Sequence, residues 1–169
     1  MGAFFMAAFS FALNALLYKY IVIDQYLSYT DHMKIKKDHV LNELVDLNEA
    51  YKTFTEKWSP RIVAGVDNYD VKIAKVEGQY VWHAHEDTDE FFLVLEGEFT
   101  LELEGRATVV LKPMQVFTVP RGQKHRPSGI PGTRILFLEQ QGTLNSGDAD
   151  LSKDPWVPIT RGVKLTEEA

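Results

Sequence analysis

A chain of 169 residues, 45% hydrophobic and 25% charged, is long enough for one globular domain and short for two. The formal net charge of -6, without a basic stripe, argues against a nucleic-acid partner, because phosphate binding requires clustered Lys and Arg. The chain has no cysteine, which excludes disulfides, thiolate catalysis and cysteine-bound zinc or iron–sulfur centres. Any metal must therefore be held by imidazole and carboxylate groups.

The N-terminal residues 1–32 stand apart from the rest of the chain. Residues 1–23 are largely apolar and carry one charged side chain, Lys19, and this length is close to the ~20 residues that a membrane-spanning helix needs. A secretory signal would carry a basic segment ahead of the apolar one, and none is present. Three interpretations are open: an extension without a role in the fold, since Met33 offers a polar start; a membrane anchor or signal-like segment; or a helix packed on the domain. We expect a cytoplasmic protein, anchored or exported only if residues 1–23 act as an anchor or signal.

Residues 33–60 are predicted to lead into the fold, with a helix over residues 38–58. Asp38 is a suitable N-cap, and Ser59-Pro60 ends the helix because proline disfavours helical geometry in the residue before it. Apolar residues recur at three- and four-residue spacing, which predicts one buried stripe. They are Leu41, Leu44, Val45, Tyr51, Phe54 and Trp58.

From Arg61 onward the apolar residues alternate with a period of two, which is typical of strands. Short β-rich runs separated by turn residues continue to residue 141 and predict an all-β domain, an antiparallel jelly-roll β-barrel, over residues 61–141. The polar residues 142–169 are expected to form a C-terminal arm over the barrel, ordered to about Ile159. Its apolar anchors are Trp156, Val157 and Ile159.

Three of the five histidines, His83, His85 and His125, are candidates for one polar site. Side chains two apart share a face of a strand, so His83 and His85 can both point into the barrel. Glu90 follows after a polar turn, and His125 arrives from a later strand after a bend at residues 120–122. Three imidazoles and one carboxylate favour Fe, Mn, Ni, Cu or Zn and leave positions open for water or substrate. The alternative is a hydrogen-bonded polar cluster without metal, which we disfavour because buried polar groups without partners cost free energy.

This stretch resembles the cupin superfamily, whose two motifs read G-x5-H-x-H-x3,4-E-x6-G and G-x5-P-x-G-x2-H-x3-N. The residues that match the first motif, with one residue fewer after the opening glycine, are Gly78, His83, His85, Glu90 and Gly97. Those that match the second are Pro120, Gly122 and His125. Met114 and Gly129 stand where the second motif has its glycine and its asparagine. The resemblance implies that neither departure affects a metal ligand.

Further segments resemble small single-domain cupins of the mannose-6-phosphate-isomerase-like group, with an RmlC-like jelly roll. They are WSPRIV at 58–63, WHAHEDTDE at 82–90, VPRGQKH at 119–125 and LNSGD at 144–148. The resemblance covers residues 39–159 and implies a homodimer, which would cover Phe91 and Leu93 on the outer face of their strand. It does not establish sugar-phosphate isomerisation, because one fold carries many reactions.

Several other side chains are weaker candidates. Their parity along the strands predicts that Tyr80 and Trp82 face outward, whereas Phe92 and Val94 line the pocket beside Glu90. A basic group near the mouth could hold an anionic substrate or be a solvated loop cluster; its members are Arg121, Lys124 and Arg126. Further candidates for the pocket lining are Lys72, Lys75 and Gln79.

We expect a divalent transition metal (Fe, Mn, Ni or Zn) and a small-molecule ligand. The leading hypothesis is a metal-dependent enzyme that acts on a small polar metabolite, either an isomerase or epimerase or an oxygenase. The sequence offers no clear general base besides the ligands. The alternatives are a non-enzymatic cupin that binds a small molecule or the metal itself, and a structural metal that braces the strands.

Overall fold

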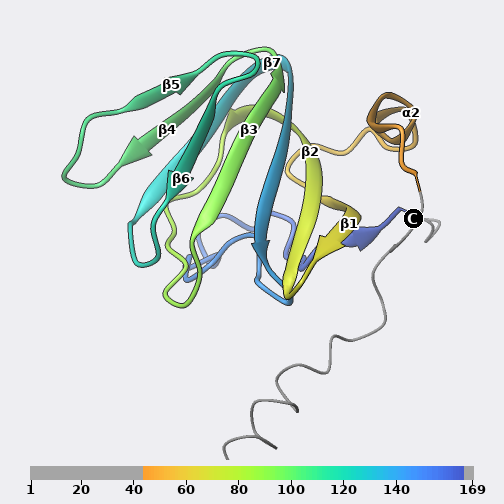
Figure 1. Ribbon diagram of the computed structural model, residues 1–169. Helices are drawn as coiled ribbons and strands as arrows, with labels where there is room; N and C mark the ends of the chain where they lie inside the picture. The colour runs from red at the N-terminus through yellow and green to blue at the C-terminus, as the bar shows by residue number, and fades with distance from the viewer. Residues whose placement is uncertain (1–43, 166–169) are drawn as a thin grey trace, which may run out of the picture. The chain divides into compact units, whose positions relative to one another are not determined.

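The computed structural model describes residues 44–165, and these are mostly strands with one short helix (Figure 1). The elements are α2 (Leu47–Lys52), β1 (Arg61–Val66), β2 (Tyr69–Gln79), β3 (Glu90–Glu96), β4 (Phe99–Leu103), β5 (Val109–Leu111), β6 (Val116–Val119), β7 (His125–Gln140) and β8 (Val163–Lys164). The prediction of an all-β fold is confirmed. The interpretations of residues 1–32 lie outside the described residues. Within residues 44–165, no helix has the length and apolar character needed to cross a membrane.

Strand β7 is the centre of the sheet. On one side its residues 125–129 pair with β4 and its residues 134–138 pair with β3, while the other side pairs with β2 from Ser128 to Gln140 (Figure 1). The main path of the sheet is β5-β4-β7-β2-β1-β8, and β3 joins β6 to β7 off this path. One strand therefore connects the two parts of a jelly-roll-like arrangement.

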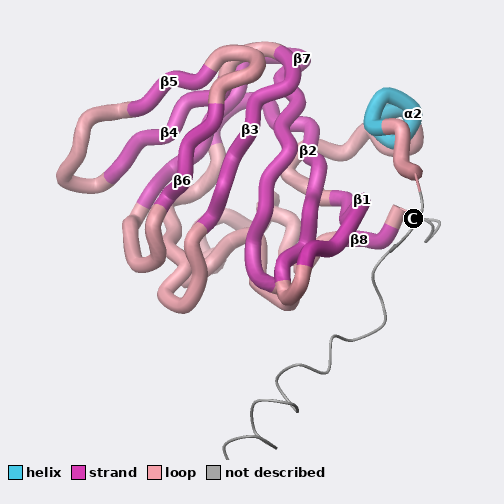
Figure 2. Tube along the Cα trace, viewed as in Figure 1, coloured by secondary structure: helices cyan, strands magenta, loops and turns pink. Residues whose placement is uncertain are grey.

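The predicted jelly-roll fold is confirmed, and its hydrogen-bonded sheet is open. Among the described residues β5 pairs with β4 alone, β6 pairs with β3 alone, and no ladder joins β5 to β6. Both strands are short, and the turn at residues 112–115 separates them. Between the named strands the pairing is antiparallel, apart from a short parallel contact between β1 and β8, which lie side by side in Figure 2.

The helix is shorter than the predicted 38–58. Residues 44–46 are not helical, Asp46 is the N-cap of α2, and its carboxylate accepts hydrogen bonds from the N–H groups of Asn48 and Glu49. The predicted cap Asp38 lies outside the described residues. Helix α2 ends at Lys52, with Thr53 as the C-cap, whose N–H donates to the carbonyl of Ala50. The chain then runs to the sheet, where the N–H of Trp58 donates to the carbonyl of Lys75 at 2.9 Å. Of the predicted stripe, Tyr51, Phe54 and Trp58 are buried, but Leu44 is 95% exposed.

Strand β2 is buried on both faces, which places one face toward the site. Ile73 packs with Tyr51 and Phe54 of the helical lead-in, whereas Ala74 and Val76 belong to the larger interior cluster.

Two departures from the cupin motifs also have local explanations. Met114 keeps the positive φ of 67° for which a glycine is the usual choice. A Cβ at Gly129 would lie 2.8 Å from Cγ2 of Val76, so an asparagine has no room there.

The C-terminal arm is ordered beyond the predicted Ile159, because β8 pairs with β1. Val157 is buried, as expected of an anchor. Trp156 and Ile159 are 54% and 65% exposed, so they anchor the arm less than predicted.

Candidate metal centre

The four candidate ligands converge from three places in the chain. His83 and His85 lie in the segment between β2 and β3, Glu90 is the first residue of β3, and His125 is the first residue of β7. Two backbone hydrogen bonds join His83 to His125, each with an N···O distance of 2.9 Å. The segment was predicted to be a strand, but it contains only this isolated bridge. The convergence therefore comes from tertiary contacts rather than from strand parity.

The irregular segment also changes the orientation of its aromatic residue. Tyr80 was predicted to face outward, but it is 5% exposed and its ring meets that of His83 edge-on, with centroids 5.6 Å apart. Parity fails here because β2 ends at Gln79. Parity holds in β3, where Phe92 and Val94 are buried on the face of Glu90.

The side chains of the cluster present one ligand atom each to a common centre. These atoms lie within 4.8 Å of one another, and all four residues are buried. Oε2 of Glu90 lies 3.3 Å from Nε2 of His125 and 3.6 Å from Nε2 of His85. These contacts lack hydrogen-bond geometry, and all three atoms are buried without a hydrogen-bond partner. Such orphaned polar atoms are costly unless a further group satisfies them.

Backbone carbonyls fix the tautomers of two of the histidines. Nδ1 of His83 lies 3.0 Å from the carbonyl of Val81, and Nδ1 of His125 lies 3.0 Å from the carbonyl of Gln123. A carbonyl can only accept, so Nδ1 carries the proton in each ring. The Nε2 lone pair of a neutral ring is then available to the cluster, which is the usual arrangement of a metal-bound histidine.

The electrostatics of the cluster favour two neutral rings beside a carboxylate. Burial lowers the pKa of His83 to about 4, with a further lowering by His125, and burial also lowers the pKa of His85. Burial opposes the charged form of Glu90, but the adjacent rings of His125 and His85 outweigh it and lower the pKa of Glu90. For His125 burial acts downward, yet the carboxylate of Glu90 raises its pKa.

This donor set fits a divalent transition metal. Three imidazole nitrogens and one carboxylate oxygen are the ligand types of Zn, Fe, Mn and Ni sites. Bonds of about 2.1 Å span up to about 4.2 Å between opposite ligands, so a small contraction of the 4.8 Å cluster brings all four atoms within bonding range. The orphaned atoms of His85, Glu90 and His125 supply the physical reason for a bound cation.

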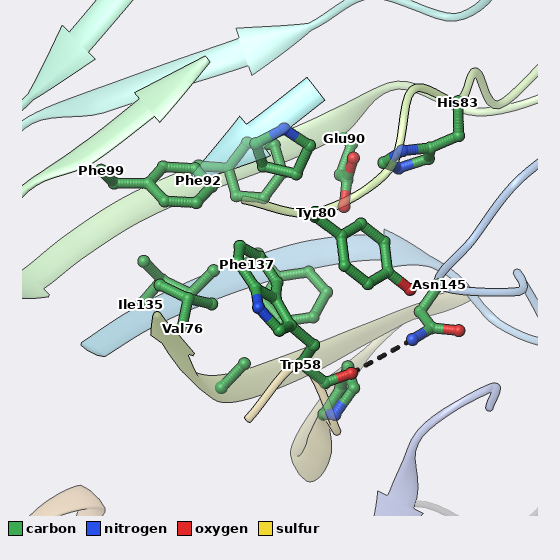
Figure 3. Close-up of a pocket in the computed structure, with 13 residues that line it drawn as sticks. Trp58, Val76, Tyr80, His83, Glu90, Phe92, Phe99, Ile135, Phe137 and Asn145 are labelled. Atoms are coloured by element: carbon green, nitrogen blue, oxygen red, sulfur yellow. Dashed lines mark hydrogen bonds between the residues drawn. The ribbon is translucent and has the colours of Figure 1, made fainter. Parts of the chain in front are cut away.

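Two hollows adjoin the cluster. A cavity of about 40 Å³, lined mainly by aromatic and aliphatic side chains, has His83, Glu90 and Asn145 as its polar members (Figure 3). His85 lines a separate polar groove of about 470 Å³, formed with residues 86–88 and with residues of the arm. The groove is within the size range of sites for small organic ligands, whereas the cavity has room for little more than one solvent molecule.

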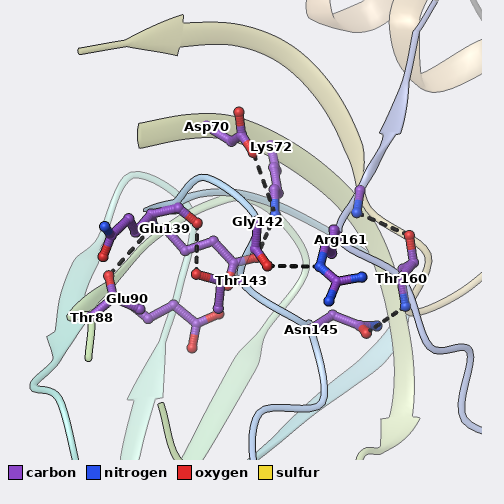
Figure 4. Close-up of polar contacts among 12 residues, drawn as sticks. Asp70, Lys72, Thr88, Glu90, Glu139, Gly142, Thr143, Asn145, Thr160 and Arg161 are labelled. Atoms are coloured by element: carbon purple, nitrogen blue, oxygen red, sulfur yellow. Dashed lines mark hydrogen bonds and ion pairs between the residues drawn. The ribbon is translucent and has the colours of Figure 1, made fainter. Parts of the chain in front are cut away.

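A second polar cluster lies next to the first on the interior face of the sheet (Figure 4). Nζ of Lys72 lies 2.8 Å from Oε1 of Glu139 and 3.9 Å from Oδ2 of Asp70, and all three residues are buried. The β3–β7 register pairs Phe91 with Leu138, so Glu139 is the cross-strand neighbour of Glu90. Burial, with added repulsion from Glu90, raises the pKa of Glu139 to about 7. Lys72 thus faces the interior but is held by an ion pair.

The sequence did not point to Glu139. Its position within an alternating apolar run, at the parity of Ile135 and Phe137, was the available signal. Of the other lining candidates, Lys75 donates to the carbonyl of Phe54 and Gln79 donates to Glu102, outside both hollows.

The basic group expected at the mouth of the site is charge-paired. Arg121 meets Asp89 at 3.2 Å, Lys124 meets Glu104 at 3.9 Å and Arg126 meets Glu102 at 2.7 Å. The guanidinium of Arg126 also lies over the ring of Trp82. This pairing favours the solvated loop cluster over an anion-binding site.

Comparisons with known proteins agree on the type of domain. Residues 70–137 match the family model described as a cupin domain. YdbB of Bacillus subtilis, an uncharacterized protein, is 35% identical over 86 residues, which are 51% of this chain and 76% of YdbB. A cupin-2 domain containing protein from Shewanella frigidimarina is 33% identical, with a TM-score of 0.55 over 57% of this chain and 94% of its own. Protein NMB1881 from Neisseria meningitidis, 22% identical with a TM-score of 0.53 over 58% and 99% of the two chains, shows the same fold.

Proposed function

The chain belongs to the cupin superfamily, and from that premise we propose that it is a metal-dependent enzyme acting on a small polar metabolite. His83, His85, Glu90 and His125 would hold the metal. The observation that carries the proposal is the group of three orphaned ligand atoms on His85, Glu90 and His125, one of which borders an open groove. When bound, a divalent metal at this donor set supplies Lewis-acid or redox chemistry.

The residues around the cluster support a role in binding and orienting a ligand. His85 shares its groove with Thr88, Gln140 and Thr143, whose amides and hydroxyls offer hydrogen bonds to a polar molecule. The carboxylates of Glu86, Asp87 and Asp148 outnumber the guanidinium of Arg161 in the same groove. This charge balance favours a neutral or cationic metabolite over an anionic one.

Glu139 is a candidate for proton transfer that the sequence alone did not offer. Its Oε2 atom is buried without a hydrogen-bond partner. Glu139 is also the neighbour of Glu90 on the adjacent strand, across the β3–β7 pairing. A carboxyl group with a pKa near 7 is suited to general acid–base work at neutral pH. The reaction would then be an isomerisation or epimerisation; bound iron and consumption of oxygen would favour an oxygenase.

One rival function has an observation in its favour. The cavity beside His83 and Glu90 measures about 40 Å³, which suits a metal with its solvent better than an organic molecule. A non-enzymatic cupin that binds the metal or a small ligand would need no larger space.

Elemental analysis of the purified full-length protein tests the proposal, together with a thermal-shift screen of neutral sugars, amines and aromatic diols, with sugar phosphates and keto acids as the anionic comparison. We expect about one transition-metal ion per chain and its loss in His85→Ala. Arg121→Ala, a change in the exposed loop, is the control and should keep the metal. Unchanged metal content in His85→Ala would contradict the site. Metal binding without any turnover or ligand would favour the non-enzymatic cupin.

Homodimerisation is a further proposal. Phe91 and Leu93 are partly buried, and the exposed apolar residues nearest them in the sheet are on β6 and its preceding turn, with Val116 57% and Met114 79% exposed. Strand β6 has one free edge among the described residues, which is a ready surface for pairing. Light scattering after gel filtration should give a dimer, and Val116→Glu should give a monomer.

A further inference from the structure

The segment that carries His83 and His85 has few bonds to the sheet. It lies outside any strand, and His83 is tied to β7 through His125. The carbonyl of His85 accepts from the N–H of Gly122 at 2.8 Å, and Gly122 is itself in a turn. The spacing of the two rings therefore depends on the residue between them, Ala84.

Ala84 is held at both of its backbone groups by one residue of the C-terminal arm. Its N–H donates to Oδ1 of Asp148 at 2.6 Å, and its carbonyl accepts from the N–H of Asp148 at 3.1 Å. A hydrogen bond to an ionised carboxylate is roughly twice as strong as one between neutral groups. Asp148 thus performs the role that a neighbouring strand would play for a residue within a sheet.

The adjacent Gly147 allows the arm to come this close. Its φ is +50°, and a Cβ there would lie 2.2 Å from the carbonyl oxygen of Ala84 and 3.2 Å from Cδ2 of His83. Any side chain would push the arm off the histidine segment. The contact is therefore made between backbones, and glycine is required on both steric and conformational grounds.

Asn145 ties this part of the arm to the rest of the domain. Its amide donates to the carbonyls of Trp58 at 3.2 Å (Figure 3) and Pro158 at 3.0 Å. Its Oδ1 accepts from the N–H of Thr160 (Figure 4). Asn145 also lines the cavity that contains His83 and Glu90. Asn145 therefore fixes this part of the arm next to the candidate metal centre.

We propose that residues 145–148 of the arm form a positioning clamp, which sets the placement of His83 and His85 through Ala84. This inference rests on the proposed metal centre and adds to it a group of residues that touch no metal. Losing contacts that orient metal ligands typically lowers metal affinity about 10- to 100-fold. Because the side chain of Asp148 is exposed, its truncation leaves no core cavity.

Titration of the full-length protein with Co²⁺, against a competing chelator, tests the clamp. Asp148→Ala should weaken binding about 10-fold and Gly147→Ala about 100-fold, and both should alter the visible spectrum of the bound Co²⁺. Asp148→Asn keeps an acceptor oxygen and should recover most of the affinity. The matched control is Asp150→Ala on the same arm, whose carboxylate accepts from Ser152 and not from the histidine segment; it should bind as the wild type does.

The outcomes separate the clamp from the metal centre itself. A wild-type protein that binds no Co²⁺ overturns the proposed function and the clamp together. A wild type that binds Co²⁺ with Asp148→Ala equally tight overturns the clamp alone. Thermal melts of the metal-free forms give the readout for a merely structural role: equal melting temperatures for Asp148→Ala and wild type, with unequal affinities, support positioning. If Gly147→Ala does not fold, the Asp148 pair still decides the question.

Discussion

Two polar clusters lie on the interior face of neighbouring strands, and they differ in how their charges are matched. In one, the ammonium of Lys72 is paired at 2.8 Å with the carboxylate of Glu139. In the other, Glu90 and the rings of His85 and His125 face one another without hydrogen bonds, and no Lys or Arg side chain is among the four donors. The first cluster carries its own counter-charge, whereas the second would be completed by the proposed metal. Burial of polar residues alone therefore does not identify a metal site; three unmatched ligand atoms facing one centre do.

Removing the counter-charge from the first cluster should give the largest effect. Lys72→Met leaves Glu139 buried without its partner, which we expect to cost about 3–5 kcal/mol of unfolding free energy. Urea unfolding followed by circular dichroism measures the loss. The double variant Lys72→Met/Glu139→Leu should recover a large part of it, and a double variant no more stable than the single one would contradict the pairing.

Supplying the missing charge to the second cluster should stabilise the protein by a comparable but smaller amount. A metal at 100 times its Kd raises the unfolding free energy by about 2.7 kcal/mol when it binds the folded state alone. Thermal melts with metal and with excess chelator give the difference. His125→Ala should abolish it, while Lys72→Met should retain it, because Lys72 is not among the donor atoms.

Metal binding at the second cluster should depend on pH. Glu90 raises the pKa of His125, so His125 holds a proton in the metal-free protein at pH 6 that the metal must displace. Affinity should then rise by up to about tenfold per pH unit and level off above the pKa of His125. The pKa of His83, about 4, leaves it neutral throughout this range. Calorimetry in two buffers of different ionisation enthalpy at pH 6 measures the released proton; identical heats would contradict this assignment.

An exposed ion pair provides the lower end of the comparison. The side chains of Arg121 and Asp89 are 60% and 46% exposed, and pairs of this kind contribute about 0–1 kcal/mol. Arg121→Ala should change the unfolding free energy within that range and leave the metal affinity unchanged. A loss as large as that of Lys72→Met would show that this loop pair does more than neutralise charge.

The sequence was sufficient to identify the four residues of the metal cluster, but not the contacts that hold their backbone in place. His83, His85, Glu90 and His125 were found because their spacing follows a pattern, and the structure brings all four together. Their backbone was not predictable, because residues 80–89 leave the strand geometry and are fixed by distant partners such as Asp148. Parity arguments fail for Tyr80 for the same reason.

Long-range contacts also explain the other differences. Trp58 lies outside the helix, because its N–H bonds to the carbonyl of Lys75 rather than to a preceding helical turn. The Lys72–Glu139 pair depends on the register that places Asp70 opposite Glu139. The bend at residues 120–122 placed His125 on a later strand, but apolar alternation gave no sign that this strand runs through Pro127 and Pro131 to Gln140. Within this strand the chain changes partners from β4 to β3.

The length of β7 has a consequence for how the protein reaches its native state. Strands β2, β3 and β4 each pair along one edge with residues 125–140, so they leave the ribosome before this common partner. Pairings between residues this far apart in sequence form slowly, since loop closure precedes any gain in contacts. During that interval their unpaired edges are open to association with other chains. We expect the nascent chain to depend on chaperones until β7 emerges, and the complete chain to acquire its metal centre last, because His125 arrives with that strand.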